Sequence, residues 1–579
     1  MRIVVVNAGL TRILGQRLEE TRTVRCWPGA LGLLAAGALA ACAAPEPMHS
    51  GSMQSPGPSV PLLQTPVANA YVGSVRVAGS LRPTFRWTSA SSDAAVSYQL
   101  QLSSDASFTA FVTTVPLATT SYQPAIDLPV DRTVPVGTRY YWRVRACIHI
   151  TCSPYSPARA LNLGRSDRDV NGDGFADVVV GSAGYGGDVA GKVYVYFGGT
   201  GRTLDPIPDA TVVAPTTKDF FGTAVAIAGD INGDGFADIV IGAYQSDGGT
   251  GAAYVYYGGP NPVFASADQV LRGTAPGDLF GISIASAGDI NGDGFADIAV
   301  GASGADGMKG ATYIGLGGLG GISASHVLSG KSIGDPYAKF FGMGVSSLGD
   351  LDGDGYGDLA IAVNTATNIS GYLYFGDPTA SLDAPVAMRG QGVGPIVGVG
   401  DLDGDGFADI AIDILDRLGE GAVTLYFGNA HRELALSAGI TLTQSDPGFG
   451  SSIAPAGDVN GDGFADFVVG ADPHHQGSVG GAFLYLGAPQ RDSMSFAADS
   501  LVGTPGQFAT WQVAPAGDVN GDGVDDIVIG GVTVPDNPFQ GLVHVYQGQA
   551  INVLQGSPYG TLTDRTNPPN GDYGFVVAQ

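Results

Sequence analysis

The chain has 579 residues, 44% of them hydrophobic, enough for several domains or one large repeat architecture. Its formal net charge is −27, and the excess is almost entirely aspartate, because glutamate occurs only at positions 19, 20, 46, 420 and 433. Aspartate without glutamate indicates turns and cation sites, since its short side chain reaches a metal bound by its own loop. The chain has no basic patch, which disfavours nucleic acid as a partner.

Residues 1–41 are predicted to be a secretion signal. Arg22 and Arg25 precede an apolar run over 29–41 that is too short to span a bilayer comfortably. The run ends in Leu-Ala-Ala-Cys42, which resembles the bacterial lipobox and implies a lipid on Cys42; cleavage by the ordinary secretory peptidase is the alternative. We expect a protein anchored through this lipid to a bacterial cell envelope, at the outer membrane or cell surface. Residues 42–66 predict a flexible tether.

Residues 67–165 alternate apolar and polar side chains in short runs such as 97–102 and 139–146. This period-2 pattern, interrupted by Pro, Ser and Asp, predicts an antiparallel β-sandwich. Trp87, the strand over 139–146 and the length of the segment resemble a fibronectin type III domain. Cys147 and Cys152 can close a short loop as a disulfide in an oxidising compartment; two free thiols are the alternative.

From residue 166 onward one nine-residue pattern of the type DVNGDGFAD occurs seven times. Its copies begin at Asp169, Asp230, Asp289, Asp350, Asp401, Asp458 and Asp518. A strand-like run precedes most copies, a β-branched run follows each, and a run with alternating aromatics comes later. With one more strand in each variable stretch, every unit of about 60 residues holds four antiparallel strands, the content of a propeller blade. The sequence therefore predicts an all-β chain in which a seven-bladed β-propeller over 166–579 follows the sandwich.

The repeats resemble the FG-GAP repeats of the integrin α-subunit propeller. The Phe-Gly pair (221–222, 280–281, 341–342), the cation loop and the Gly-Ala pair (242–243, 301–302, 470–471) follow in the same order. The unit of Asp401 lacks the Phe-Gly pair, and that of Asp518 has Phe508-Ala509. The resemblance implies a surface adhesion or ligand-binding scaffold for a protein or a glycan.

Each repeated loop is predicted to bind Ca²⁺. Positions 1, 3, 5 and 9 present oxygen side chains, position 7 offers its backbone carbonyl, and the glycines at 4 and 6 allow the chain to reverse. Oxygen ligands without Cys or His exclude zinc, and the loose geometry of the loop favours Ca²⁺ over Mg²⁺. Metal-free Asp/Asn/Gly turns are the alternative interpretation. Seven copies argue for about seven structural Ca²⁺ ions. The predicted ligands are Asp169, Asn171, Asp173, Phe175 and Asp177; Asp230, Asn232, Asp234, Phe236 and Asp238; Asp289, Asn291, Asp293, Phe295 and Asp297; Asp350, Asp352, Asp354, Tyr356 and Asp358; Asp401, Asp403, Asp405, Phe407 and Asp409; Asp458, Asn460, Asp462, Phe464 and Asp466; and Asp518, Asn520, Asp522, Val524 and Asp526.

The resemblance to the integrin propeller implies that a ligand binds the variable loops on the face opposite the calcium loops. Candidate contacts there are Tyr185, Tyr244, His474, His475 and Phe539. The sequence does not predict an enzyme. The G-x-S-x-G run over 330–334 lies in a variable stretch with no helix to follow it, so it does not form a nucleophile elbow. A calcium-dependent polysaccharide lyase or hydrolase, and a purely structural envelope component, are the alternative functions.

The two ends of the repeat region are complementary. The first loop lacks the Phe-Gly strand that precedes the others, and residues 573–579 align with 221–227. A propeller must join its last blade to its first or leave two sheet edges open. Residues 573–579 are therefore predicted to form a strand of the first blade, paired with 178–181.

Overall fold

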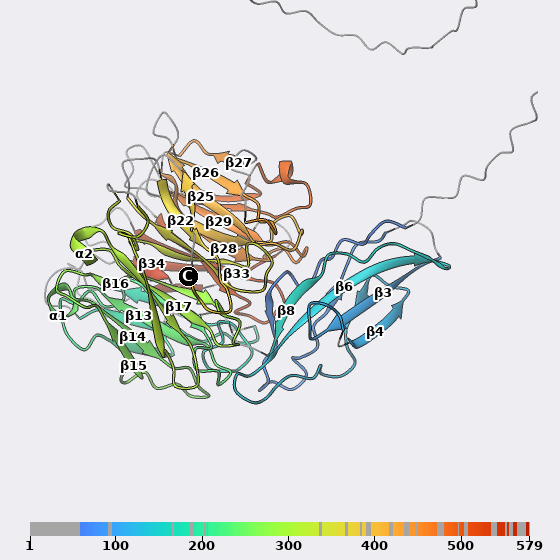
Figure 1. The fold of residues 1–579 in the computed structure, drawn as a ribbon, viewed down its shortest axis with the longest axis horizontal. Helices are drawn as coiled ribbons and strands as arrows, with labels where there is room; N and C mark the ends of the chain where they lie inside the picture. Colours follow the sequence, from blue (N-terminus) through green and yellow to red (C-terminus); the bar gives the residue numbers. More distant parts are fainter. Residues whose placement is uncertain are drawn as a thin grey trace, which may run out of the picture. The chain divides into compact units, whose positions relative to one another are not determined.

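The computed structural model describes residues 58–577 except 91–94, 110, 165–166, 184–189, 202–203, 205–206, 335–337, 365–368, 383–384, 390–394, 416–420, 433–438, 447, 472–479, 496, 503–507, 534–540, 550–552, 555–557, 559 and 564–574. Their regular secondary structure is almost entirely β-strand (Figure 1). Two short helices, α1 (Ser246–Gly249) and α2 (Ala305–Met308), and one 3-10 turn, η1 (Arg491–Ser495), complete the described elements.

The N-terminal part of the described chain forms two facing sheets. The larger sheet has the order β1 (Ala70–Val72), β8 (Arg159–Leu163), β6 (Thr138–Ile148), β3 (Val96–Ser103) and β4 (Phe111–Leu117), and β7 (Thr151–Cys152) also pairs with β6. The smaller sheet pairs β2 (Phe85–Arg86) with β5 (Ser121–Tyr122). Phe85 packs on Trp142 at 5.0 Å between ring centroids, and both side chains are fully buried. A disulfide joins Cys147 and Cys152 where β6 and β7 pair.

The packed region begins earlier than the sequence indicates. The tether was predicted to extend to residue 66, but Leu63 is buried and forms an antiparallel bridge with Trp87. Gln64 accepts a hydrogen bond through its carbonyl from Arg159 at 2.6 Å. The Pro- and Ser-rich composition of 42–66 conceals this short pairing segment, because one buried leucine gives no periodic signal.

Seven four-stranded antiparallel sheets, here called sheets I to VII, follow along the chain. Sheet I contains β36 (Phe575–Val577), β9 (Val178–Ser182), β10 (Lys192–Tyr196) and β11 (Ala210–Val213); sheet II contains β12 (Val225–Gly229), β13 (Asp238–Ala243), β14 (Ala252–Tyr256) and β15 (Gln269–Arg272); sheet III contains β16 (Phe280–Gly288), β17 (Asp297–Ala302), β18 (Ala311–Leu316) and β19 (Ala324–Ser329); sheet IV contains β20 (Val345–Gly349), β21 (Asp358–Ala362), β22 (Ile369–Tyr374) and β23 (Val386–Arg389). Sheet V contains β24 (Ile396–Gly400), β25 (Asp409–Leu415), β26 (Gly421–Tyr426) and β27 (Ile440–Thr443); sheet VI contains β28 (Phe449–Gly457), β29 (Asp466–Ala471), β30 (Gly481–Tyr485) and β31 (Asp499–Val502); sheet VII contains β32 (Phe508–Gly517), β33 (Asp526–Thr533), β34 (Gly541–Tyr546) and β35 (Gly560–Thr563).

The first strands of successive sheets contact one another in sequence, from β12 through β16, β20, β24 and β28 to β32. The strand β36 takes the corresponding place in sheet I, where it pairs with β9 through Val576 and Gly181, and it contacts both β32 and β12. This is the pairing that the complementary ends of the repeat region predict, and the arrangement fits a β-propeller.

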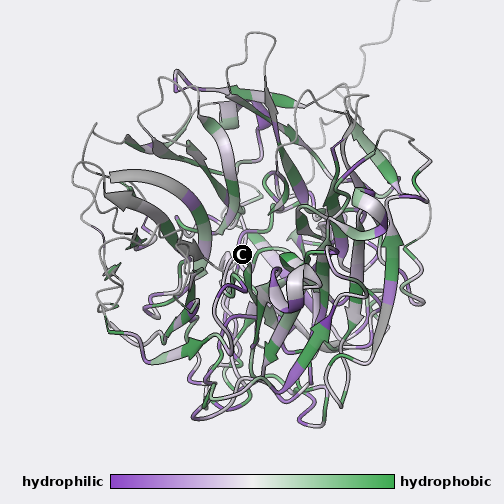
Figure 2. Ribbon diagram, turned by 90° about the vertical axis from the view of Figure 1, so that its left-hand side faces the viewer, coloured by the Kyte–Doolittle hydropathy of each residue, from purple (hydrophilic) through white to green (hydrophobic). Residues whose placement is uncertain are grey.

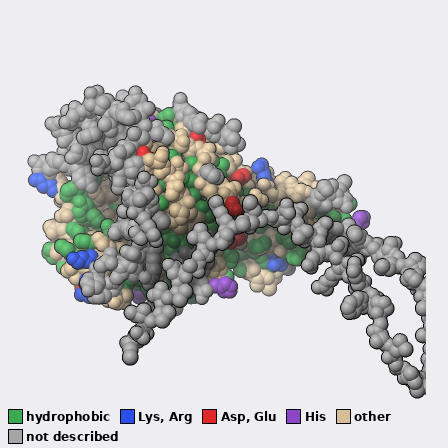
Figure 3. All heavy atoms as spheres, turned by 90° about the horizontal axis from the view of Figure 1, so that it is seen from above, with side chains coloured by type: hydrophobic (Ala, Val, Ile, Leu, Met, Phe, Trp, Pro, Cys, Tyr) green, Lys and Arg blue, Asp and Glu red, His purple; other side chains and the backbone are tan. Residues whose placement is uncertain are grey.

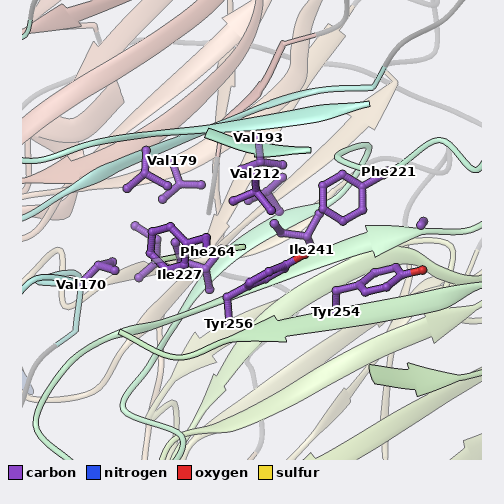
Figure 4. Close-up of a cluster of buried hydrophobic side chains, with 14 of the residues drawn as sticks. Val170, Val179, Val193, Val212, Phe221, Ile227, Ile241, Tyr254, Tyr256 and Phe264 are labelled. Atoms are coloured by element: carbon purple, nitrogen blue, oxygen red, sulfur yellow. The ribbon is translucent and has the colours of Figure 1, made fainter. Parts of the chain in front are cut away.

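The Phe-Gly and Gly-Ala pairs belong to the junctions between sheets. Phe221 lies in a core shared by sheets I and II and meets the ring of Tyr254 at 5.5 Å (Figure 4). A Cβ on Gly242 of sheet II would lie 2.2 Å from the carbonyl oxygen of Gly281 in sheet III. The Gly of one sheet therefore makes room for the backbone of the next Phe-Gly pair. Figure 2 shows hydrophobic residues along many of the described strands.

Sheet V carries Asp413 at the position that Gly242 occupies in sheet II. One carboxylate oxygen of Asp413 is buried without a hydrogen-bond partner among the described residues, and burial raises its pKa from 3.8 to about 7. Because the pKa of Asp413 is higher in the folded protein than in the unfolded chain, ionisation of Asp413 lowers the free energy of unfolding. This loss of stability grows as pH rises from about 4 through about 7. Asp413 thus departs from the glycine pattern, and this departure destabilises the folded protein.

We predict that Asp413→Asn raises the melting temperature at pH 8 in saturating calcium, corresponding to about 1–3 kcal/mol, and that the gain shrinks towards pH 5. Thermal unfolding of both proteins across this pH range measures it. Asp377→Asn is the control. The hydrogen bonds that Thr379 and Ser381 donate to the Asp377 carboxylate lower its pKa more than burial raises it, and the pKa of Asp377 falls to about 2. That variant should lose stability at pH 8. A gain for Asp413→Asn that does not depend on pH would contradict the assignment.

Candidate metal centres

The seven repeated loops are here called loops I to VII. Loops II to VII join the first and second strands of sheets II to VII, whereas loop I only precedes the second strand of sheet I, β9, because the first strand of that sheet, β36, comes from the C-terminal end. Position 1 of each loop is an aspartate that organises the turn. In loop I, Asp169 accepts hydrogen bonds from the backbone N–H groups of Gly172 at 2.6 Å and Gly174 at 2.7 Å. The bond from the position-6 glycine recurs in all seven loops at 2.7–3.0 Å. Positive φ at the glycines of positions 4 and 6 brings these N–H groups round the carboxylate.

Position 9 is an aspartate buried completely in every loop. One oxygen accepts the N–H of position 2 at 2.7–3.1 Å. The other accepts the N–H of the glycine that follows the third strand of the same sheet, at 2.8–3.0 Å. This carboxylate therefore ties the loop to its sheet. Burial raises the pKa of Asp297 and of Asp358 to about 8, so the ionised form needs further compensation.

Position 7 has a role that the sequence analysis missed. Besides its backbone carbonyl, its side chain packs on the position-4 glycine of the preceding loop: a Cβ on Gly172 would lie 2.4 Å from the ring of Phe236. The same contact joins every successive pair of loops and closes with Phe175 of loop I against Gly521 of loop VII. The recurrence of Phe or Tyr at this position in six of seven copies was the available signal.

Backbone hydrogen bonds run round the loops in the same direction. The N–H of position 8 in each loop donates to the carbonyl of position 1 in the preceding loop at 2.9–3.3 Å, from Ala237 with Asp169 to Ala176 with Asp518. The seven loops thus form one closed ring of contacts. A loop that loses its shape loses a partner on each side, which makes the loops mutually dependent.

The oxygens of loop IV fit a divalent cation. Oxygens of Asp350, Asp352 and Asp358 lie within 4.8 Å of one another, as do those of Asp401, Asp403 and Asp405 in loop V. Oδ1 of Asp350 is buried without a hydrogen-bond partner among the described residues. Carboxylate and carbonyl oxygens in a loose cluster are the donors that Ca²⁺ takes, and a cation would compensate the burial that raises the pKa of Asp350 to about 6. The predicted ligands of all seven loops fall within the described residues.

The sandwich contacts the same end of the sheets as the loops. Arg76 lies 3.8 Å from the ring centre of Phe236 and donates to the carbonyl of Asp234 at 2.8 Å. Arg139 donates to Gly355 of loop IV at 3.0 Å, and the buried Arg159 donates to Gly463 of loop VI at 3.2 Å. The preceding domain therefore contacts loops II, IV and VI.

The predicted ligand face is described only in part. Tyr244 is half-buried and stacks on Phe220 at 5.2 Å, whereas Tyr185, His474, His475 and Phe539 lie outside the described residues. Figure 3 shows the molecule from above. Where that view shows described residues, charged side chains are sparse among hydrophobic and neutral ones. Ser332 of the G-x-S-x-G run sits in a turn and donates to the carbonyl of Ser329 at 2.7 Å, which is not the setting of a nucleophile elbow.

Four stretches of the repeat region match a known family of repeats. The FG-GAP repeat model matches residues 167–196, 221–256, 280–319 and 449–482. The chain is 40% identical to human integrin alpha-6 over 137 residues, 23% of this chain and 12% of that protein. It is 36% identical to integrin alpha-PS5 of Drosophila melanogaster over 186 residues, 31% of this chain and 18% of the relative, and 36% identical to integrin alpha-5 of Xenopus laevis over 181 residues, 29% and 17%.

The chain thus carries integrin-α-like FG-GAP repeats, and its matches span less than a fifth of the length of these relatives. The family-model matches lie within the repeat region. Among the residues that the structure describes, neither short helix has the length and apolar character needed to cross a bilayer.

Proposed function

We propose that the chain is a calcium-binding surface protein whose seven sheets form a seven-bladed β-propeller that binds a protein ligand. The observation that carries the proposal is the closed ring of cation loops at one end of the sheets, with the sandwich packed against it. A face occupied by structural cations and a neighbouring domain leaves the opposite ends of the strands for a ligand. There, α1 and α2 present the exposed pairs Asp247–Arg272 and Asp306–Lys331.

The domain before the propeller is proposed to be of the fibronectin type III kind. Its support is the pair of facing sheets, with Phe85 and Trp87 from one side packed against Trp142 and Tyr98 from the other. Its arginines at the cation loops make it a spacer that holds the propeller in a fixed orientation.

A catalytic role for the end of the propeller axis that faces away from the sandwich has little support. On the side away from the sandwich, a cavity of about 220 Å³ is lined by the innermost strands of several sheets. Its described lining consists of aliphatic residues with Thr223, Ser283, Ser346 and Gln512, and it includes no Asp, Glu or His. Hydrolase and lyase chemistry on polysaccharides needs such acid and base groups.

A binding screen tests the proposed function. Residues 43–579, without the lipid, are immobilised in 2 mM calcium and probed with purified extracellular-matrix and cell-surface proteins and, separately, with a glycan array. We expect saturable binding to a protein, lost in chelator and weakened by Arg272→Asp on the proposed ligand face. Arg82→Asp, which disrupts the Arg82–Asp127 pair of the sandwich, is the matched control. Binding to glycans alone would show that the ligand is a glycan and not a protein. No binding to proteins or glycans would refute the proposed ligand-binding function.

The lipid anchor makes a separate prediction. Cys42→Ser should move the protein from the membrane fraction to the soluble fraction, or leave it unprocessed, because the thiol that carries the lipid is lost. Fractionation followed by mass spectrometry of the mature N-terminus measures both outcomes. Cys26→Ser, which precedes the proposed cleavage site, is the control and should fractionate as wild type. Wild-type membrane levels of the Cys42→Ser protein would refute lipidation at this residue.

A further inference from the structure

Loops IV and V differ from the other five at position 3, where Asp352 and Asp403 replace asparagine. In loops I, II, III and VI the asparagine amide donates to Oδ2 of the position-5 aspartate at 2.9–3.1 Å. An ionised aspartate has no proton to donate, and it adds a charge beside that same oxygen. Loops IV and V therefore need another donor.

In both loops the donor is an arginine from the next sheet. Arg432 of sheet V contacts Asp352 through Nε and donates from Nη2 to Asp354 at 2.8 Å. Arg491 of sheet VI forms the equivalent pair, with Asp403 and, at 3.4 Å, with Asp405. The side chains of Asp352 and Asp403 are only 3% and 6% exposed. A buried carboxylate left without a partner costs much more than a solvated one.

An aromatic ring completes each arrangement. Arg432 lies 5.0 Å from the ring centre of Phe375 in sheet IV, and Arg491 lies 3.9 Å from that of Phe427 in sheet V. Each guanidinium thus meets carboxylates and a ring of the same neighbouring sheet. Each arginine therefore belongs to one sheet and contacts the loop and the aromatic ring of the preceding sheet.

The two arginines occupy equivalent positions, four residues after the glycines Gly428 and Gly487. Sheets II, III and IV have Pro262, Gly321 and Ala380 there, and they follow loops that have asparagine at position 3. In loop VII, which also has asparagine, Gln547 contacts Asp522. The equivalent position of sheet I is Arg202, which lies outside the described residues. Within the described residues, the arginine accompanies an aspartate at position 3.

The pairing also balances charge. Relative to asparagine, an aspartate at position 3 together with its arginine adds no net charge to the loop. Arg139, 3.7 Å from Asp350, and Arg159, 3.9 Å from Asp401, are further cations beside loops IV and V. An extra negative charge within a few ångströms of a Ca²⁺ site would strengthen cation binding and destabilise the cation-free loop. The arginine removes both effects.

We propose that Asp352–Arg432 and Asp403–Arg491 are ionic clasps between successive sheets. In each clasp, an arginine of the following sheet takes the place of the asparagine amide. The arginine thereby keeps the cation affinity of loops IV and V equal to that of the other loops. The clasp itself rests on the hydrogen bonds and ion pairs of the two arginines. The statement about affinity rests on the proposed calcium-binding function.

A double-mutant cycle in chelator tests the clasp. Arg432→Met should lower the melting temperature by about 2 °C or more, because two carboxylates lose their partner. Asp352→Asn combined with Arg432→Met recreates a loop with asparagine and should melt within about 1 °C of wild type. Arg272→Met is the matched control, since Arg272 is equally exposed and pairs with Asp247 outside any cation loop. If Arg432→Met does not fold, the double variant alone still tests whether asparagine at position 352 removes the need for the arginine.

Hydrogen exchange of peptides covering 350–358, followed against buffered free calcium, tests the affinity. Arg432→Met should lower the calcium midpoint of loop IV on the order of tenfold, and the double variant should restore it. The peptide covering 289–297 of loop III is the internal control. Additive effects of the two substitutions in chelator would overturn the clasp, and an unchanged midpoint would overturn the charge balance. Indifference of the wild-type protein to calcium would instead refute the proposed function, while the cycle in chelator still decides the clasp.

Discussion

Removal of calcium is expected to lower the melting temperature by more than about 10 °C. A ligand that binds only the folded state stabilises it by mass action, and an extracellular-type site with Kd ~10⁻⁴ M contributes about 1–2 kcal/mol in millimolar calcium. Seven such sites, joined by the hydrogen bonds from position 8 of one loop to position 1 of the preceding loop, act together. Without the cation, buried aspartates such as Asp297 and Asp358 have strongly raised pKa values and are costly to ionise.

Differential scanning fluorimetry in 2 mM calcium, 2 mM magnesium and chelator measures this effect. Magnesium should restore little of the loss, because it keeps its waters and demands a stricter geometry than these loops offer. Asp289→Asn should remove about one site's share of the calcium effect. Asp268→Asn is its control, since Asp268 binds the backbone N–H of Tyr257 at 2.8 Å away from any loop. A melting curve indifferent to chelator would refute structural calcium.

The strands and the loops could be predicted from the sequence because both depend on local patterns. Alternating apolar residues specify strands, and Asp and Gly at fixed offsets specify a turn whose oxygens converge. The pairing of β36 with β9 was also predictable, although about 400 residues separate them, because the repeat lacks a strand at one end and has an extra one at the other. Repetition turned a long-range contact into a visible pattern.

The contacts between loops could not be predicted in the same way. Phe236 fills the space above Gly172 only because successive sheets stand side by side, and within a single copy each residue has a sufficient local explanation. Arg432 meets Asp352 across 80 residues of sequence, from a stretch that varies between units. The sandwich arginines, such as Arg159, reach the loops from a different domain. Such contacts depend on how sheets and domains pack, which no local pattern records.

Deletion of residues 573–579 is expected to lower the melting temperature by about 10 °C. The deletion removes β36 from sheet I, where it pairs with Val180 and Gly181 of β9 and contacts both β32 and β12. Val178, Val179 and Val180 are almost fully buried, and the loss of the neighbouring strand exposes part of this surface at about 1–3 kcal/mol for each large apolar side chain. Opening the sheet also leaves an unpaired edge.

Two further constructions separate ring closure from simple shortening of the chain. A deletion of residues 578–579 alone leaves β36 in place and should melt like the full chain. A synthetic peptide covering 571–579, added to the longer deletion, should restore most of the lost stability, because an exposed sheet edge accepts an added strand. Rescue requires the edge of β9 to be free, so a peptide with Pro at 575 and 577 should fail, since proline cannot donate to the ladder. A 573–579 deletion that melts like the full chain, or rescue by the proline peptide, would show that β36 does not close the ring.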